Sequence, residues 1–301
     1  MNNPLVSILI PVYNREELII KSIDSSLKQT YNNIEIIIVD NCSKDNTWKL
    51  LQDYAKKDKR IKVFRNDKNI GPVLNWKRCL EEAKGEYAKL LFSDDLISDN
   101  FIKNSLSVFD KNVAFVISEI EIFNNHKVLY NQKQYKNKSY SVKKYYEEIL
   151  LYNNIVFSVS PGSALFRTKD IRKSLLVEIP NEFNLDFKRF GAGTDLLIFL
   201  LAAKDYSKIN ISKDTKAYFR SHDNSFTTSN DLDIYYNYSK YYFIKQFYPK
   251  LLSRFKSVLW IYSIKNNKKD EILNLIPNNI SLLFLIKMIL MKVFKLVIYR
   301  F

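Results

Sequence analysis

Two adjacent carboxylates, Asp94 and Asp95, are the side chains in this sequence that could most readily do chemistry. They follow an apolar run, residues 87–92, that is typical of a buried strand. Open α/β sheets bind ligands beyond the carboxyl ends of their strands, which is where the pair falls. Because neighbouring carboxylates repel each other, they need a cation, and their oxygens suit Mg²⁺ or Mn²⁺ shared with substrate phosphates. The alternative is a solvated acidic turn that caps the next helix.

The elements that would position this pair alternate between strand and helix over the first hundred residues. Crossovers of this length predict an α/β fold with a doubly wound, mostly parallel sheet. The carboxyl ends of its strands would bring Tyr13, Asp40 and the carboxylate pair to one edge. The predicted strands cover residues 6–10, 34–39, 61–64 and 87–92, and the predicted helices cover residues 16–29, 45–57 and 72–84.

Beyond residue 100 the pattern changes. Residues 113–140 predict short antiparallel strands or loops, and residues 141–151 and 193–204 predict helices. A further strand is expected at 215–219. After residue 231 the sequence is helical, aromatic and basic, so we place a domain boundary near residue 230.

Glycine and cysteine usage narrows the function classes. The five glycines cannot form a Gly-x-Gly-x-x-Gly or Walker-type loop, which argues against a nicotinamide or P-loop nucleotide site. Cys42 and Cys79 have neither metal-ligand nor redox spacing. With no secretory pattern at the N-terminus, they predict a reduced, intracellular protein.

Seven short motifs occur in order along the chain. They are Ile10-Pro-Val-Tyr-Asn-Arg15, the segment Glu35–Asp45, Asn69-Ile-Gly-Pro72 with Asn75, Ala83-Lys-Gly-Glu-Tyr87, Ser93-Asp-Asp95, Gly193-Thr-Asp195 and Arg220-Ser-His222. Together they resemble the family 2 glycosyltransferases, which have the GT-A fold, over residues 5–225. The resemblance implies a Rossmann-like nucleotide-binding half over residues 1–100 and an acceptor half over residues 101–230. The helical pattern beyond residue 231 adds a C-terminal extension over residues 231–301.

The resemblance implies that the chain binds a nucleotide sugar, with a UDP-sugar expected. Tyr13 would offer a flat surface to the base, although core packing is its alternative role. Asp40 would accept a hydrogen bond from the imide N–H of a uracil, with helix capping as the alternative. Asp94 would face the ribose or the bridging region. The residues expected to contact the nucleotide sugar are Pro11, Tyr13, Arg15, Asp40, Asn69, Asp94 and Arg220.

Metal binding and base catalysis are assigned by the same resemblance. Asp95 would ligate Mn²⁺ or Mg²⁺, which would neutralise charge on the departing diphosphate as a Lewis acid. His222 would be a further metal ligand or a phosphate contact, unless it is a surface residue. Asp195 would be the general base for the acceptor hydroxyl in a transfer that inverts the anomeric carbon. Helix capping is the alternative for Asp195.

Three positions depart from the family pattern. Ser93 stands where an acid is more frequent, Asn41 where many relatives have a second Asp, and Thr194 where many carry Glu. Residues 160–163 resemble the segment lining the acceptor side of the pocket, and an ordinary tight turn explains them equally well.

Positive charge is concentrated at the C-terminal end. The net charge is +15, and ten of these excess charges lie between residue 234 and the end. The mostly apolar segment 280–301 is interrupted by Lys and Arg, so its uncharged stretches fall short of the roughly 20 residues that span a bilayer. An in-plane helix on an anionic membrane fits this pattern, and a helical bundle packed on the catalytic domain is the alternative.

We therefore expect an inverting, metal-dependent glycosyltransferase, cytoplasmic and peripheral on the inner face of a bacterial plasma membrane. Its acceptor would be a hydroxyl of a lipid-linked or cell-surface glycan of the capsule, O-antigen or lipooligosaccharide type. A nucleic-acid-binding protein is one alternative, but no recognised motif supports nucleic acid as a partner, and the basic residues are interleaved with apolar ones. A catalytically silent nucleotide-sugar binder is the other alternative.

Overall fold

The computed structural model describes residues 3–124, 127–131, 135–152, 154–221, 232–266, 280–286 and 288. Its internal contacts divide the chain into two compact units. The first unit comprises Met1–Tyr145 and Ser158–Asn230, and the second comprises Tyr146–Phe157 and Asp231–Phe301. The second unit thus includes residues 146–157, which the sequence analysis assigned to the acceptor half.

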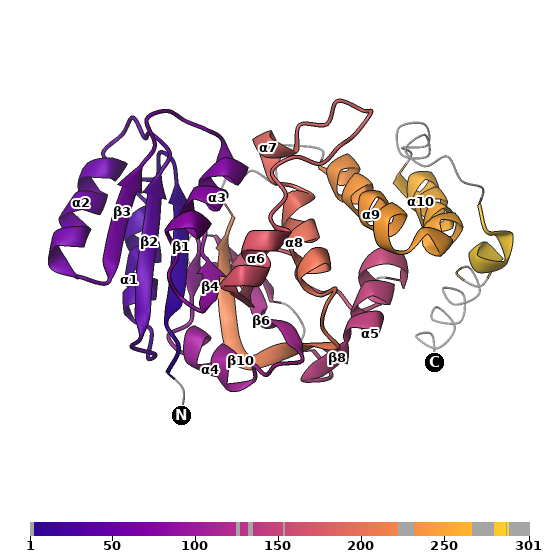
Figure 1. Ribbon diagram of the computed structural model, residues 1–301, viewed down its shortest axis with the longest axis horizontal. Coiled ribbons are helices and arrows are strands. Elements are labelled where there is room, and N and C mark those ends of the chain that lie inside the picture. Colours follow the sequence, from indigo (N-terminus) through magenta and orange to yellow (C-terminus); the bar gives the residue numbers. More distant parts are fainter. Residues whose placement is uncertain are drawn as a thin grey trace. The chain divides into compact units, whose positions relative to one another are not determined.

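The first unit is built on one large sheet (Figure 1). Its strands are, in spatial order, β3 (Ile61–Arg65), β2 (Ile34–Asp40), β1 (Val6–Val12), β4 (Tyr87–Leu90), β9 (Ala164–Arg167), β6 (Val113–Asn124), β10 (Lys208–Arg220) and β5 (Leu96–Ile97). The strands from β3 to β4 are parallel, and so are β6 and β10, whereas β9 runs antiparallel to both of its neighbours. The doubly wound, mostly parallel sheet expected from the sequence is therefore confirmed.

Burial explains why these segments form central strands. All seven residues of β1 and all seven of β2 are buried, as expected for parallel strands that are covered on both faces. The helices that pack on the sheet are α1 (Ile19–Leu27), α2 (Thr47–Lys57), α3 (Pro72–Glu82), α4 (Phe101–Ser107), α6 (Thr168–Ser174) and α8 (Thr194–Ala202), and the short α7 (Phe187–Phe190) packs on α3.

A buried carboxylate joins the strands of the nucleotide-binding half. Oε1 of Glu35 accepts hydrogen bonds from the Ser7 hydroxyl and the Lys84 backbone N–H, both at 2.7 Å. Oε2 of Glu35 accepts from Lys62 Nζ at 2.6 Å. A Cβ on Gly85 would come within 2.6 Å of the Ser7 nitrogen, so the turn before β4 requires glycine. These contacts hold β1, β2, β3 and the start of β4 in register.

Two strands of the acceptor half differ from the sequence prediction. Residues 113–124 form the single long strand β6, which pairs with the short β7 (Lys127–Asn131) but also lies deep in the sheet beside β9 and β10. β10 begins at Lys208 rather than at 215, and its register shifts between Ser212 and Lys216. Asp214 has a φ of 58° within that shift, so an irregular backbone interrupts the period on which the prediction depended. β8 (Ser139–Ser141) pairs with the first part of β10.

The second unit is helical. It contains a π-helical turn (Glu148–Tyr152), α9 (Asp233–Phe247), a 3₁₀ turn (Pro249–Leu251) and α10 (Leu252–Asn266), and α5 (Val142–Glu147) crosses the boundary between the units. Aromatic rings form its core, with Phe243 packed 5.2 Å from Tyr146 and 5.7 Å from Tyr248, centroid to centroid. In the described part of the chain, no helix has the length and apolarity needed to cross a membrane.

Candidate active site

The loops that follow β1 and β2 are joined at the carboxyl edge of the sheet. Asn14 (φ 50°) and Cys42 (φ 64°) both adopt the left-handed conformation, each two positions after the last residue of its strand. Oδ1 of Asn14 accepts a hydrogen bond from the Lys44 backbone N–H at 2.9 Å, and the Asn14 N–H donates to Ser43 Oγ at 2.9 Å. The edge that was expected to bind a nucleotide is therefore built from two mutually braced loops.

Asp40, the last residue of β2, is held by a cation. Its side chain has no exposed surface, and Oδ2 lies 3.1 Å from Nε of Arg65, the last residue of β3. Both carboxylate oxygens also accept from the Ser43 N–H at 3.2 Å. Arg65 lies over the Trp48 ring at 5.3 Å and donates through Nη2 to the Ser43 carbonyl at 2.8 Å, and it is the partly exposed member of this ion pair. Tyr13, which is 36% exposed, follows the end of β1 at the same edge.

A network of amide side chains surrounds Asn41. Its Oδ1 accepts from Asn66 Nδ2 and from the Ile70 N–H, both at 3.0 Å. Its Nδ2 donates to Asn69 Oδ1 at 2.8 Å and to the Gly71 carbonyl at 3.3 Å. A carboxylate cannot donate, so Asn fits this position better than the Asp of many family members. Asn69, a predicted nucleotide-sugar contact, thus also orders the loop before α3.

The carboxylate pair meets two arginines from distant parts of the chain. Oδ1 of Asp95 accepts a hydrogen bond from the Arg220 backbone N–H at 3.0 Å, and Nε of Arg220 donates to the Asp94 carbonyl at 3.1 Å. The Arg15 guanidinium lies 3.9 Å from Asp94 Oδ2. The structure therefore brings together four of the residues that were predicted from sequence, from the ends of β1, β4 and β10.

Asp95 is buried and lies beside a second carboxylate, and both features alter its pKa. Burial, together with the neighbouring Asp94, raises the pKa of the Asp95 carboxyl well above its usual range, against the opposing effects of the Arg220 N–H and the Lys89 ammonium. Burial lowers the pKa of Lys89 to about 7, with Asp95 acting in the opposite direction. A divalent cation beside Asp95 would favour its ionised form and oppose the effect of burial.

The donor set also fits such a cation. Carboxylate oxygens are the ligands that Mg²⁺ and Mn²⁺ prefer, and these ions commonly take one or two protein carboxylates plus substrate phosphates. Among the described residues, no cluster of three or more His, Cys, Asp or Glu side chains could hold a metal ion without such a substrate. His222, the other predicted ligand, lies outside the described residues.

Asp195 comes from a separate element, in the first turn of α8. Gly191 (φ 70°) and Gly193 (φ 80°) form the backbone that leads into this helix. A Cβ on Gly191 would come within 2.5 Å of the Trp76 ring, which packs 5.5 Å from Phe92, centroid to centroid. Trp76 thereby contacts both the backbone that precedes Asp195 and the segment that carries the carboxylate pair.

The 3₁₀ turn Pro161–Ser163 is the tight turn considered in the sequence analysis. Its last residue, Ser163, donates through Oγ to Ser158 Oγ at 2.7 Å.

The sequence pattern does not predict a role for two residues of this region, Lys89 and Arg65. A lysine inside the apolar run 87–92 is itself a signal of a buried charge, whereas Arg65 has no local signal.

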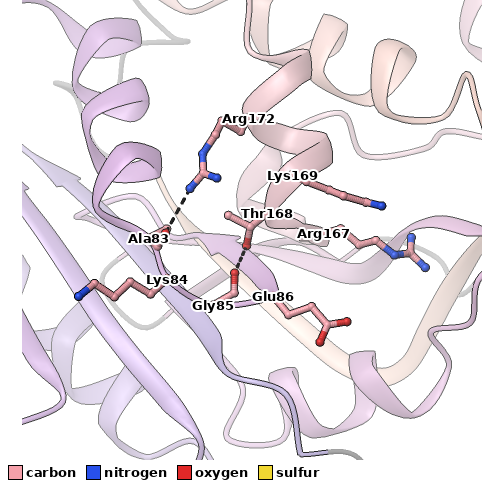
Figure 2. Close-up of a pocket in the computed structure, with 8 residues that line it drawn as sticks. All are labelled: Ala83, Lys84, Gly85, Glu86, Arg167, Thr168, Lys169 and Arg172. Atoms are coloured by element: carbon pink, nitrogen blue, oxygen red, sulfur yellow. Dashed lines mark hydrogen bonds between the residues drawn. The ribbon is translucent and has the colours of Figure 1, made fainter.

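A surface pocket of about 370 Å³ lies at the other end of β4. Figure 2 shows its lining, which includes Thr168, Arg172 and Lys84. The Thr168 hydroxyl donates to the Gly85 carbonyl at 2.6 Å, and Arg172 donates to the Leu80 carbonyl at 2.7 Å. Since Gly85 precedes β4 and Asp94 follows it, this pocket is not the predicted nucleotide site.

Comparisons with known proteins identify the family of this chain. Residues 7–175 match the family model described as Glycosyl transferase family 2. WfgD of Escherichia coli, a UDP-Glc:alpha-D-GlcNAc-diphosphoundecaprenol beta-1,3-glucosyltransferase, is 36% identical over 130 residues, which are 43% of this chain and 51% of WfgD. The chain spans between a third and just over a half of the length of the curated relatives it matches.

Two solved structures share the fold. TarS from S. aureus, in complex with UDP-GlcNAc, superposes with a TM-score of 0.57 at 20% identity, over 89% of this chain and 68% of TarS. The mannosyltransferase PcManGT from Pyrobaculum calidifontis, in complex with GDP-Man and Mn²⁺, superposes with a TM-score of 0.51 at 14% identity, over 91% of this chain and 67% of PcManGT. The expected GT-A fold is therefore confirmed.

Proposed function

The chain belongs to glycosyl transferase family 2, and on that premise we propose that it transfers a sugar from a UDP-sugar to a hydroxyl group of a glycan acceptor. The observation that carries the proposal is the cluster of Asp94, Asp95, Arg15 and Arg220 at the carboxyl edge of the sheet. A diphosphate needs both cationic side chains and a metal-binding carboxylate, and this cluster offers them together.

The nucleoside would bind over the braced loops after β1 and β2. The exposed Tyr13 ring, which follows the buried Pro11, offers a face for the base. Because Asp40 is fully buried and paired with Arg65, we propose that the pair acts as a unit, with the guanidinium toward the base. Asn69 and Asp94 would contact the nucleotide sugar, and Arg15 and Arg220 would face the phosphates.

Asp95, with Asp94 beside it, would hold Mn²⁺ or Mg²⁺, and His222 is the further proposed ligand. When bound, the cation supplies Lewis-acid stabilisation of the charge that develops on the departing diphosphate. The burial of Asp95 beside the partly exposed Asp94 supports this assignment, because a cation there would stabilise the ionised carboxylate.

Asp195 is proposed as the general base that removes the proton from the acceptor hydroxyl. Asp195 lies in the first turn of α8, and the glycine-containing backbone before this helix packs against Trp76. Both features support a fixed position for this carboxylate. Direct attack by the activated hydroxyl would invert the anomeric carbon.

The acceptor is proposed to be a lipid-linked glycan, the class that WfgD is named for. Residues 1–230 would be the catalytic domain and residues 231–301 a helical extension on the cytoplasmic face of the bacterial membrane. Within the extension, Leu282 and Leu283 are 68% and 82% exposed, which supports contact with an apolar phase. Residues 287 and 289–301 of the proposed amphipathic segment lie outside the described residues. Replacing both leucines with Asp should weaken binding to anionic vesicles, and unchanged binding would exclude this contact.

A screen of nucleotide sugars for Mn²⁺-dependent thermal stabilisation tests the donor assignment. We expect UDP and one or more UDP-sugars to raise the melting temperature in Mn²⁺ but not in EDTA. Stabilisation without any turnover would instead favour a catalytically silent binder. Stabilisation by single-stranded DNA at moderate salt, and by no nucleotide sugar, would favour a nucleic-acid-binding protein.

A further inference from the structure

Lys89 is a fully buried charged side chain in the middle of β4. Lysine is almost never fully buried unless it is paired, because the desolvated ammonium group is costly. Here Nζ donates hydrogen bonds to the Leu90 carbonyl at 3.0 Å and to the Gly162 carbonyl, and it lies 4.5 Å from the centre of the Phe101 ring. The fold thus surrounds the ammonium with two carbonyls and an aromatic face.

The Gly162 carbonyl belongs to the 3₁₀ turn Pro161–Ser163, which packs between two parts of the proposed active site. A Cβ on Gly162 would lie 3.1 Å from the Phe219 ring and 3.4 Å from the Phe92 ring. Phe219 directly precedes Arg220, and Phe92 lies two positions before Asp94. The turn therefore packs against both segments that carry the phosphate- and metal-binding groups.

The same turn supports the helix that carries Asp195. α8 packs on the turn and on β6. The turn is also tied to β6, because the Ser118 hydroxyl donates to the Ser163 carbonyl at 3.0 Å. A shift of the turn would therefore change the position of Asp195 relative to the carboxylate pair.

We propose that Lys89 is a positioning residue that, by holding the Gly162 carbonyl, fixes the distance between Asp95 and Asp195. The inference rests on the proposed function, since it assigns the two carboxylates to opposite sides of one transfer reaction. Lys89 itself does not touch the substrate. Its contribution is to keep the base aligned with a donor whose binding depends on other residues.

Lys89→Met removes the ammonium and keeps the approximate side-chain length. The assay measures the rate of UDP release from the UDP-sugar that the wild type uses. We expect this rate to be about tenfold to a hundredfold lower in Lys89→Met, because misplacing a catalytic group by about an ångström has a cost of this order. The Kd for UDP measured in EDTA should stay within about twofold, because the proposed nucleotide contacts are unchanged and Asp95, whose pKa the Lys89 ammonium lowers, takes part only through the metal. A matched control is Lys62→Met. It removes the ammonium group that pairs with the buried Glu35 carboxylate, at a site away from this turn. This control should leave turnover unchanged.

Amide hydrogen exchange supplies a readout that needs no substrate. The N–H groups of Ser163, Asp195 and Leu197 donate to Ser160, Gly191 and Gly193 respectively. Lys89→Met should speed exchange at these amides and leave the amides of β1 and β2 as in the wild type. A wild type that releases no UDP from any nucleotide sugar would refute the proposed function, whereas unchanged exchange here would refute the positioning role on its own.

Gly162→Ala is the second variant, in case Lys89→Met does not fold. It keeps the ammonium and crowds the turn against Phe219 and Phe92 by a few tenths of an ångström. We expect the same pattern of reduced turnover with retained UDP affinity. Wild-type turnover in Lys89→Met, or in Gly162→Ala if the first variant is unfolded, overturns the proposal, as does a parallel loss of UDP binding.

Discussion

The backbone N–H of Arg220 donates a 3.0 Å hydrogen bond to the Asp95 carboxylate, although the two residues lie 125 positions apart in the sequence. The bond joins the end of β10 to the segment that follows β4. It also orients one oxygen of the carboxylate that we propose as the metal ligand. The site is therefore assembled by the sheet as a whole rather than by one motif.

Replacing Asp95 should remove the metal-dependent part of nucleotide binding. Asp95→Ala is expected to bind UDP in Mn²⁺ no better than the wild type binds it in EDTA, because the proposed ligand is lost. Titration calorimetry with UDP measures the difference. Asp53→Ala, which removes an exposed carboxylate paired with Lys56, is the matched control and should bind as the wild type. Mn²⁺-dependent affinity that survives in Asp95→Ala would show that the cation binds elsewhere.

Asp195→Asn should separate turnover from binding. The amide cannot take a proton, so the rate of transfer is expected to fall about 10²- to 10⁴-fold while the affinity for UDP stays constant. Steady-state kinetics and calorimetry on the same preparation measure both. Asp186→Asn is a suitable control, because Asp186 caps α7 by accepting from the Arg189 N–H at 3.2 Å and Asn caps helices equally well. Loss of UDP affinity in Asp195→Asn would make Asp195 a nucleotide ligand.

Asn41→Asp should destabilise the nucleotide-binding half. The carboxylate would face the Asn69 side-chain oxygen and the Gly71 carbonyl, to which the amide now donates. Losing these bonds should lower the free energy of unfolding at pH 7 by about 1–3 kcal/mol. Urea titration measures the change, with Asn112→Asp at an exposed position as the control. Unchanged stability in Asn41→Asp would mean that the amide network does not hold the loop.

Glu35 should make stability depend on pH. Burial alone would raise its pKa, but hydrogen bonds from Lys62, Ser7 and the Lys84 N–H outweigh burial and lower the pKa. Because the pKa is lowered, ionised Glu35 contributes to the free energy of unfolding at pH values above the ordinary glutamate pKa of about 4.3. This contribution is lost as the pH falls through the pKa of Glu35 in the folded state.

Glu35→Gln should therefore lower the free energy of unfolding at pH 7 by about 1–3 kcal/mol and flatten its decrease between about pH 5 and pH 3. Urea titrations across this range measure both effects. Glu81→Gln, which removes an exposed carboxylate of a helical pair with Lys77, should follow the wild-type pH profile. A Glu35→Gln profile as steep as that of the wild type would assign the acid sensitivity to other carboxylates.

Local patterns were enough to predict the nucleotide-binding half and the carboxylate pair. The strands of this half are short apolar runs bounded by turn residues. Asp40 is the last residue of β2, and Asp94 lies four positions after the end of β4. Partners that the fold brings from a distance were not predictable in this way. Strand order and register determine three such features: the pairing of Asp40 with Arg65, the burial of Lys89 against Gly162 and the full length of β10. Local periodicity contains no information on strand order or register.

Release of nucleoside diphosphate from a panel of nucleotide sugars is the measurement that addresses the proposed transfer most directly. The panel would include UDP-glucose, UDP-GlcNAc and GDP-mannose, each with Mn²⁺ or EDTA, with and without a polyprenyl-diphosphate-linked GlcNAc acceptor. We expect UDP release from a UDP-sugar that needs Mn²⁺, rises with an acceptor and disappears in Asp95→Ala. Release that persists undiminished in EDTA and in Asp95→Ala, or no release from any nucleotide sugar, would contradict metal-dependent sugar transfer at this site.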